Sequence, residues 1–122
     1  MVGKVLICDD EPNIVESLSY IVKKLGLAFV VAGNGVQAIE LARRENPDLI
    51  FLDVGMPDMD GYQACKELKS DPSTNTAYVI MLTAHGQRSD EFSAKQAGAD
   101  EFMTKPFSPR RLSQRLEQIM AR

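Results

Sequence analysis

The sequence predicts an α/β fold in which five short strands form one parallel sheet that is covered by helices on both faces. Strand-like and helix-like segments alternate five times along the 122 residues. The strand-like segments are almost wholly apolar, which is typical of strands buried on both faces of a sheet. Polar residues follow four of these segments, at the edge where open α/β sheets bind their ligands. Together these observations favour a doubly wound α/β domain.

The first unit combines a strand over residues 5–8 with a helix that starts near Pro12 and stops at Gly26. Proline suits an early helical position, because the N–H that it lacks has no intrahelical partner there. The helix is indicated by apolar side chains at helical spacing: Ile14, Val15, Leu18, Ile21, Val22 and Leu25.

The second unit begins with another apolar run, residues 27–32, which predicts the second strand. The turn-forming residues at 33–35 separate this strand from a helix that ends near Pro47. The apolar side chains of that helix are Val36, Ile39 and Leu41.

The remaining three units repeat this order. Strands are predicted over residues 48–54, 78–83 and 100–104, and a loop over 55–61 leads into a helix from about 62 to 70. A polar helix that stops at Gly98 carries Phe92, Ala94 and Ala97. Ser108 is expected to cap the last helix, with Pro109 at its first position. The apolar side of this helix is formed by Leu112, Leu116, Ile119 and Met120.

Composition limits the classes of function. A chain of 122 residues with 44% hydrophobic content can bury one core without disulfides or a structural metal. The net charge of -3 gives no general attraction for nucleic acid or anionic lipid, so we expect no direct nucleic-acid binding. Cys8 and Cys65 lack C-x-x-C spacing and are interpreted as reduced thiols.

No apolar stretch approaches the length needed to span a membrane, and the N-terminal residues have no signal-peptide pattern. We therefore expect a cytoplasmic protein that does not contact membranes. The chain is the size of a single domain, residues 1–122, and we see no linker, repeat or low-complexity segment.

The candidate site consists of five polar side chains that follow four of the apolar runs. Asp9 and Asp10 follow the first strand, Asp53 the third, Thr83 the fourth and Lys105 the fifth. Because the carboxyl ends of parallel strands meet at one edge of the sheet, we expect all five to lie together. Singly, each side chain has an ordinary explanation as a helix cap, a strand end or a solvated charge. Their joint placement favours a functional site.

The chemistry of this cluster follows from its charge. Three carboxylates at one edge repel one another unless some are protonated or a cation binds among them. Mg²⁺ prefers oxygen ligands and keeps several waters, which leaves positions for phosphoryl oxygens. Such an ion also allows a carboxylate to attack phosphorus, because it neutralises the incoming negative charge. We therefore expect Mg²⁺ and a phosphoryl group at this site.

Four segments resemble the receiver domain of two-component response regulators, of the chemotaxis-receiver type. They are residues 8–12 (CDDEP), 52–61 (LDVGMPDMDG), 82–84 (LTA) and 105–107 (KPF). The resemblance implies a flavodoxin-like sheet with strand order 2-1-3-4-5.

By that resemblance, Asp53 accepts a phosphoryl group from a sensor histidine kinase or a histidine phosphotransfer protein. Asp10, Asp53 and the backbone carbonyl of Gly55 are expected to bind Mg²⁺, with Asp9 acting largely through metal-bound water. Thr83 and Lys105 are expected to contact the phosphoryl oxygens, and the peptide bond from Lys105 to Pro106 is expected to be cis.

The resemblance also implies a switch between two conformations. The phosphoryl group draws Thr83 inward, and the space that it leaves accepts the aromatic side chain of Phe102. Many relatives carry tyrosine at this position, so a signal that needs a tyrosine hydroxyl is not expected here. Gly55 and His85 are expected to set the lifetime of the phosphoryl group. Gly55 has an alternative explanation as a residue that the loop backbone needs, and His85 as a solvated loop residue.

We expect a phosphoacceptor with at most weak intrinsic phosphotransfer and autodephosphorylation, rather than an enzyme. It is either a free-standing protein, with no effector domain, or part of a longer regulator or hybrid kinase. Its output partner is expected on the face formed by the fourth helix, fifth strand and fifth helix, which carries Arg110, Arg111 and Arg115. Those arginines meet either an acidic partner or water. The chain is expected to be a monomer or a phosphorylation-linked dimer.

Other classes lack their central motifs. A flavin carrier needs a phosphate-binding loop after the first strand, where residues 9–11 are all acidic. A dinucleotide enzyme needs G-x-G-x-x-G at that place, and an aspartyl-phosphate hydrolase of the haloacid dehalogenase type needs D-x-D. Within the same fold, the alternative is an interaction scaffold that does not depend on phosphorylation.

Overall fold

The computed structural model describes residues 3–56, 59–84 and 88–121. Strands and helices alternate along the chain, as predicted. They are β1 (Lys4–Cys8), α1 (Pro12–Lys24), β2 (Ala28–Ala32), α2 (Gly35–Glu45), β3 (Leu49–Asp53), α3 (Gly61–Ser70), β4 (Tyr78–Thr83), α4 (Arg88–Gln96), β5 (Glu101–Thr104) and α5 (Pro109–Met120).

The five strands form one parallel sheet in the order β2-β1-β3-β4-β5, which confirms the predicted topology. The register pairs Cys8 with Leu52, Asp53 with Leu82, and Thr83 with Thr104. The carboxyl ends of β1, β3, β4 and β5 therefore lie at one edge. This alignment brings residues far apart in the sequence to a single place.

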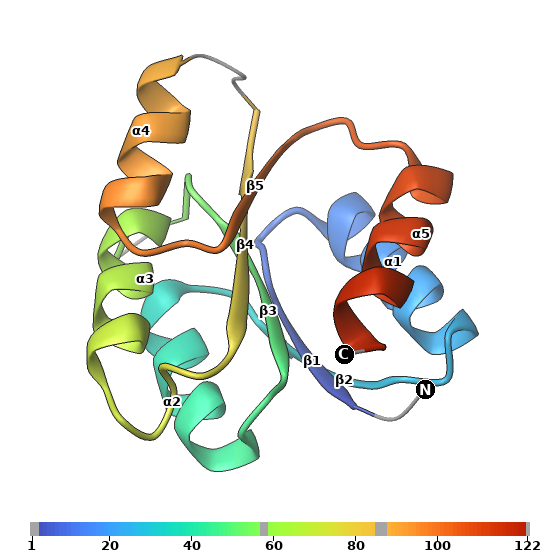
Figure 1. The fold of residues 1–122 in the computed structure, drawn as a ribbon, viewed down its shortest axis with the longest axis horizontal. Coiled ribbons are helices and arrows are strands. Elements are labelled where there is room, and N and C mark those ends of the chain that lie inside the picture. Colours follow the sequence, from blue (N-terminus) through green and yellow to red (C-terminus); the bar gives the residue numbers. More distant parts are fainter. Residues whose placement is uncertain (1–2, 57–58, 85–87, 122) are drawn as a thin grey trace.

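Helices cover both faces of the sheet (Figure 1), with α1 and α5 on one face and α2, α3 and α4 on the other. Each face has its own core. Ile7 and Phe51 pack with α1 and α5, whereas Leu6, Ile50 and Met81 point to the opposite face. Because successive strand residues alternate between two buried faces, the central strands are apolar except at their ends.

Capping side chains place the helix ends within a residue or two of the predicted positions. Asn34 accepts a hydrogen bond from the Gln37 N–H at 2.8 Å, so α2 begins at Gly35. Asp60 accepts one from the Gln63 N–H at 2.8 Å, so α3 begins one residue before its predicted start. Ser108 caps α5 as predicted.

Helix α2 ends at Glu45, close to its predicted end near Pro47. It ends there because the next residue, Asn46, adopts a left-handed conformation with φ of 48°. Strands β2, β3 and β5 are slightly shorter than predicted. The flanking residues Leu27, Asp48, Val54 and Asp100 lie outside the ladder.

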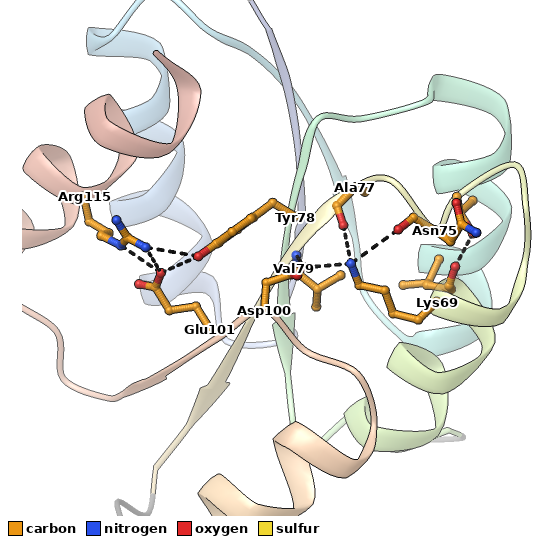
Figure 2. Close-up of polar contacts among 10 residues, drawn as sticks. Lys69, Asn75, Ala77, Tyr78, Val79, Asp100, Glu101 and Arg115 are labelled. Atoms are coloured by element: carbon orange, nitrogen blue, oxygen red, sulfur yellow. Dashed lines mark hydrogen bonds and ion pairs between the residues drawn. The ribbon is translucent and has the colours of Figure 1, made fainter. Parts of the chain in front are cut away.

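A polar network joins α3 to the start of β4 and β5 (Figure 2). The ammonium group of Lys69 donates to the Ala77 carbonyl oxygen and to the Asp100 carboxylate, both at 2.7 Å. The same Asp100 oxygen accepts a hydrogen bond from the Val79 N–H at 2.8 Å. One carboxylate, that of Asp100, therefore ties the start of β5 to β4 and to α3.

A second network fastens α5 to the sheet (Figure 2). Arg115 contacts Glu101 through Nε at 2.8 Å and through a terminal nitrogen at 2.6 Å, and that nitrogen also donates to the Tyr78 hydroxyl at 3.1 Å. The Tyr78 hydroxyl in turn donates to Glu101 at 2.8 Å. The expectation that Arg115 meets only water or a partner is therefore wrong, because its guanidinium is bound within the chain.

None of the helices formed by the described residues is both long enough and apolar enough to cross a lipid bilayer.

Replacing Asp100 with alanine is expected to lower the free energy of unfolding by about 1–3 kcal/mol, because it leaves Lys69 and the Val79 N–H without their shared acceptor. Urea unfolding followed by circular dichroism measures this change. Glu67→Ala removes an exposed carboxylate of α3 and serves as the control. Equal stability of the two variants would contradict the assignment.

Candidate active site

Three aspartates meet at the carboxyl edge of the sheet. Asp53 is the last residue of β3, and Asp9 and Asp10 directly follow β1. Carboxylate oxygens of the three residues lie within 4.8 Å of one another. Asp9 and Asp53 are only 2% and 5% exposed, whereas Asp10 is exposed. The predicted convergence of the three carboxylates is confirmed.

Lys105 supplies the positive charge that this cluster requires. Its ammonium nitrogen lies 2.9 Å from Asp9 Oδ2, 3.2 Å from Asp53 Oδ1 and 2.9 Å from Glu11 Oε1. The Lys105 side chain is 9% exposed. One lysine therefore bridges two buried carboxylates and one at the surface.

The two oxygens of Asp9 have different surroundings. Oδ1 accepts a hydrogen bond from the Glu11 N–H at 2.9 Å. Oδ2 is buried and, although Lys105 is close, it has no hydrogen bond of acceptable geometry from any described residue. A buried carboxylate oxygen that has an ion-pair partner but accepts no hydrogen bond is unusual. It is available to a further ligand.

The surroundings shift the protonation equilibria of both partners. Burial raises the pKa of Asp9 above its ordinary value, and the charge of Asp53 adds to this effect, while Lys105 and the Glu11 N–H act in the opposite direction. Burial alone would lower the pKa of Lys105, but its carboxylate partners Asp9, Glu11 and Asp53 raise it. Lys105 is therefore firmly cationic, and the cluster as a whole keeps an excess of negative charge.

Thr83 and Lys105 are connected through the backbone. Thr83 ends β4 with only 3% exposure, and its carbonyl oxygen accepts the Lys105 N–H at 2.7 Å. The peptide bond between Lys105 and Pro106 is cis, as the resemblance implied. The structure thus brings Asp9 and Asp53 into contact with Lys105, and places Asp10 and Thr83 at the same edge.

Gly55 lies in the exposed loop two residues after Asp53. A Cβ atom added to Gly55 meets nothing within 4 Å among the described residues, and its φ lies outside the left-handed range. Neither a left-handed φ nor a close contact with a described residue therefore requires glycine at this position. His85 lies outside the described residues, so its predicted part in the lifetime stays a prediction.

Phe102 lies in the middle of β5, paired with Met81 in the neighbouring strand. Its side chain is partly buried and packs against the core on the α2, α3 and α4 face. An intermediate position of this kind is compatible with movement of the ring in either direction. The switch itself stays a prediction.

Both cysteines are free and fully buried. The Cys8 sulfur lies 3.1 Å from the Met56 sulfur. Burial raises the pKa of the Cys8 thiol to about 12, with added repulsion from Asp9, Asp53 and Asp10. Cys8 is therefore a packing residue rather than a nucleophile, and neither cysteine forms a disulfide.

Two residues of the site were not singled out from the sequence. Glu11 appeared only as part of a motif, although it directly follows the acidic pair and its charge could have suggested a partner for Lys105. Gly61 gave no chemical signal. Its backbone passes so close to Asp53 that an added Cβ would collide with the Asp53 carbonyl oxygen. Gly61 therefore allows the loop to close over the end of β3.

The donor set suits a hard divalent cation. It offers carboxylate oxygens within reach of one another, one of them buried without a hydrogen bond, and an excess of negative charge. Oxygen ligands of this kind are those that Mg²⁺ and Ca²⁺ prefer. The residues present therefore fit a divalent metal ion.

Comparison with known proteins agrees with this geometry. The family model of the response regulator receiver domain matches residues 5–117. The chain belongs to the response regulator receiver domain family. It spans about half the length of several curated relatives, such as PhoP, the alkaline phosphatase synthesis transcriptional regulatory protein of Bacillus subtilis. That match is 40% identical over 98% of this chain and 49% of PhoP.

Two further similarities are to proteins whose length is close to that of this chain. PilH of Pseudomonas aeruginosa is 33% identical, over 98% of both chains. The receiver domain of a sensor histidine kinase from Pseudomonas aeruginosa, solved with a magnesium ion coordinated in its active-site cleft, is 26% identical with a TM-score of 0.90. That alignment covers 100% of both chains. The receiver domain of that kinase therefore shares the fold of this chain.

Asp9→Asn is expected to raise the free energy of unfolding of the metal-free protein at neutral pH by about 1 kcal/mol, because it removes a buried negative charge beside Asp53. Folding raises the pKa of Asp9 above its ordinary value of 3.8, so the folded wild type binds a proton more readily than the unfolded chain. Its stability therefore falls as the pH rises above 3.8. Urea unfolding in the presence of a chelator measures the difference.

The gain in the free energy of unfolding should disappear at about pH 3, where Asp9 of the wild type is protonated in both the folded and the unfolded state. A variant that is less stable than wild type at neutral pH would contradict the raised pKa.

Proposed function

We propose that this receiver domain accepts a phosphoryl group on Asp53 from a sensor histidine kinase or a histidine phosphotransfer protein. The observation that carries this proposal is the contact of Lys105 with Asp53 at 3.2 Å and with Asp9 at 2.9 Å. A fixed ammonium beside a nearly buried carboxylate provides the charge that a phosphoryl group on that carboxylate needs.

The metal ion of this reaction is proposed to be Mg²⁺, held by Asp9, Asp10, Asp53 and the backbone carbonyl of Gly55. When bound, Mg²⁺ neutralises negative charge on the phosphoryl oxygens and on the carboxylates. Support comes from the carboxylate cluster and from the magnesium ion in the related kinase receiver domain. Asp9 is well suited, because its Oδ2 is buried without a hydrogen bond from the described residues.

In the proposed transfer, a carboxylate oxygen of Asp53 attacks phosphorus and forms an O–P bond. The P–N bond to the donor histidine breaks, and its electron pair returns to the imidazole ring. Lys105 pairs with one phosphoryl oxygen, and the Thr83 hydroxyl donates a hydrogen bond to another. The chain is thus a phosphoacceptor with at most weak intrinsic phosphotransfer and autodephosphorylation, rather than an enzyme acting on a separate substrate.

The proposed output is a change of the surface formed by α4, β5 and α5. Inward movement of Thr83 makes room for the Phe102 ring, which alters this surface through packing alone. A groove of about 660 Å³ lies between β5 and α5 and is lined in part by Phe102, Phe107 and Leu112. An output protein is proposed to dock there. Phosphorylation then changes the affinity of that protein.

The proposed location is the cytoplasm, which suits two free and buried thiols. The net charge of -3 supports a protein partner rather than direct contact of this domain with nucleic acid. In solution, the domain is proposed to be a monomer or a dimer whose formation depends on phosphorylation.

Incubation with acetyl phosphate and Mg²⁺ is expected to add one phosphoryl group to the wild-type chain and none to Asp53→Ala. The reason is that acetyl phosphate supplies a phosphoryl group without a kinase, while Asp53 is the proposed nucleophile. Intact-protein mass spectrometry measures the gain. Omission of Mg²⁺ should abolish it.

A gain of mass that persists in Asp53→Ala would refute the acceptor assignment. No gain in folded wild-type protein that binds Mg²⁺ would instead favour a scaffold that acts independently of phosphorylation.

Gly55→Gln is expected to lengthen the lifetime of the phosphorylated form several-fold, because the new side chain can shield phosphorus from attacking water. The open space around Gly55 indicates that the substitution leaves the fold intact. Decay of the phosphorylated mass after removal of acetyl phosphate measures the lifetime, and an unchanged circular dichroism spectrum serves as the control. An unchanged lifetime would show that water reaches phosphorus from another side.

A further inference from the structure

Glu11 differs from the other carboxylates that contact Lys105. Its side chain is 57% exposed, whereas those of Asp9 and Asp53 are 0% and 8% exposed. Yet Glu11 Oε1 lies as close to the Lys105 ammonium as Asp9 Oδ2 does, at 2.9 Å. Lys105 is therefore shared between an inner pair of carboxylates and one outer carboxylate.

The backbone of Glu11 fixes this arrangement. Glu11 is the N-cap residue of α1, and its N–H donates to Asp9 Oδ1 at 2.9 Å. A side chain at an N-cap commonly accepts a hydrogen bond from the first turn of its helix. The Glu11 side chain makes no such cap within the described residues and extends to Lys105 instead. One residue thus holds Asp9 with its backbone and Lys105 with its carboxylate.

We propose that Glu11 is a positioning residue that draws Lys105 away from the inner carboxylates. This inference rests on the proposed function and concerns the same site. With Lys105 drawn outward, the inner carboxylates are more available to a divalent cation. The same contact occupies Lys105, so a phosphoryl group must compete with Glu11 for the ammonium.

Loss of the Glu11 charge therefore has two opposite effects. Without its outer partner, Lys105 pairs more fully with Asp9 and Asp53 and competes more strongly with Mg²⁺. The local negative charge also falls, which weakens Mg²⁺ binding further. An anion bound at Asp53, in contrast, no longer competes with Glu11 for the Lys105 ammonium and is no longer repelled by the Glu11 carboxylate. If Glu11 only supported the fold, its loss would weaken the binding of both Mg²⁺ and the anion.

The test compares wild type, Glu11→Gln and the control Glu16→Gln. Glu16 lies in α1, is also exposed, and loses the same charge without a contact to Lys105. Calorimetric titration of the metal-free proteins gives the affinity for Mg²⁺ alone. A second titration at saturating Mg²⁺ uses beryllofluoride, which mimics a phosphoryl group on aspartate.

For Glu11→Gln, we expect Mg²⁺ affinity to fall and beryllofluoride affinity to rise, each by about two- to fivefold, as suits one partly exposed ion pair. Both differences should shrink at high salt, because the exposed side of the contact is screened. Glu16→Gln should match wild type.

Changes of the same sign in Glu11→Gln, or equal changes in both variants, would overturn the proposal for Glu11. Affinities equal to wild type would also overturn it. Failure of wild type to bind either Mg²⁺ or beryllofluoride would instead refute the proposed function.

Discussion

The charge balance around Lys105 is the interaction on which the rest of the site depends. Three acidic side chains gather at the end of a hydrophobic sheet, where burial and the charge of Asp53 both oppose ionisation of Asp9. The ammonium of Lys105 contacts two of them, Asp9 at 2.9 Å and Asp53 at 3.2 Å. One cation does not neutralise the whole cluster. The remaining negative charge makes the site a place for a metal ion, while Lys105 makes it a place for an anion.

The parallel sheet brings together site residues that are far apart along the chain. Asp9 and Lys105 are separated by most of the chain, and they meet because β1 and β5 belong to one sheet in which all strands end at the same edge. The buried faces fix the register, since a shift by one residue would turn apolar side chains from one core to the other. Stability of the core and geometry of the site are therefore coupled.

The residue pattern was sufficient to predict the fold class and the clustering of Asp9, Asp10 and Asp53, and the strand order followed from the resemblance to receiver domains. Hydrophobic periodicity marks the elements, and polar residues at strand ends mark the site. It could not show that Glu11 extends to Lys105, because an exposed glutamate has many rotamers and no periodic signal. Arg115 was misjudged for a similar reason. Arg115 lies in α5, whereas its partners Glu101 and Tyr78 lie in β5 and β4, so only the packed structure brings them together.

Gly61 shows how a residue without functional groups can control a reactive one. Its backbone lies against the carbonyl oxygen of Asp53, and no other amino acid fits that space without moving β3 or the loop. A mutational scan scored by signalling output would therefore rank Gly61 with the acidic residues, although it takes no part in the chemistry. Only a separate assay of folding would distinguish displacement of the acceptor from loss of its carboxylate. Sensitivity to substitution is thus a poor guide to chemical participation in this loop.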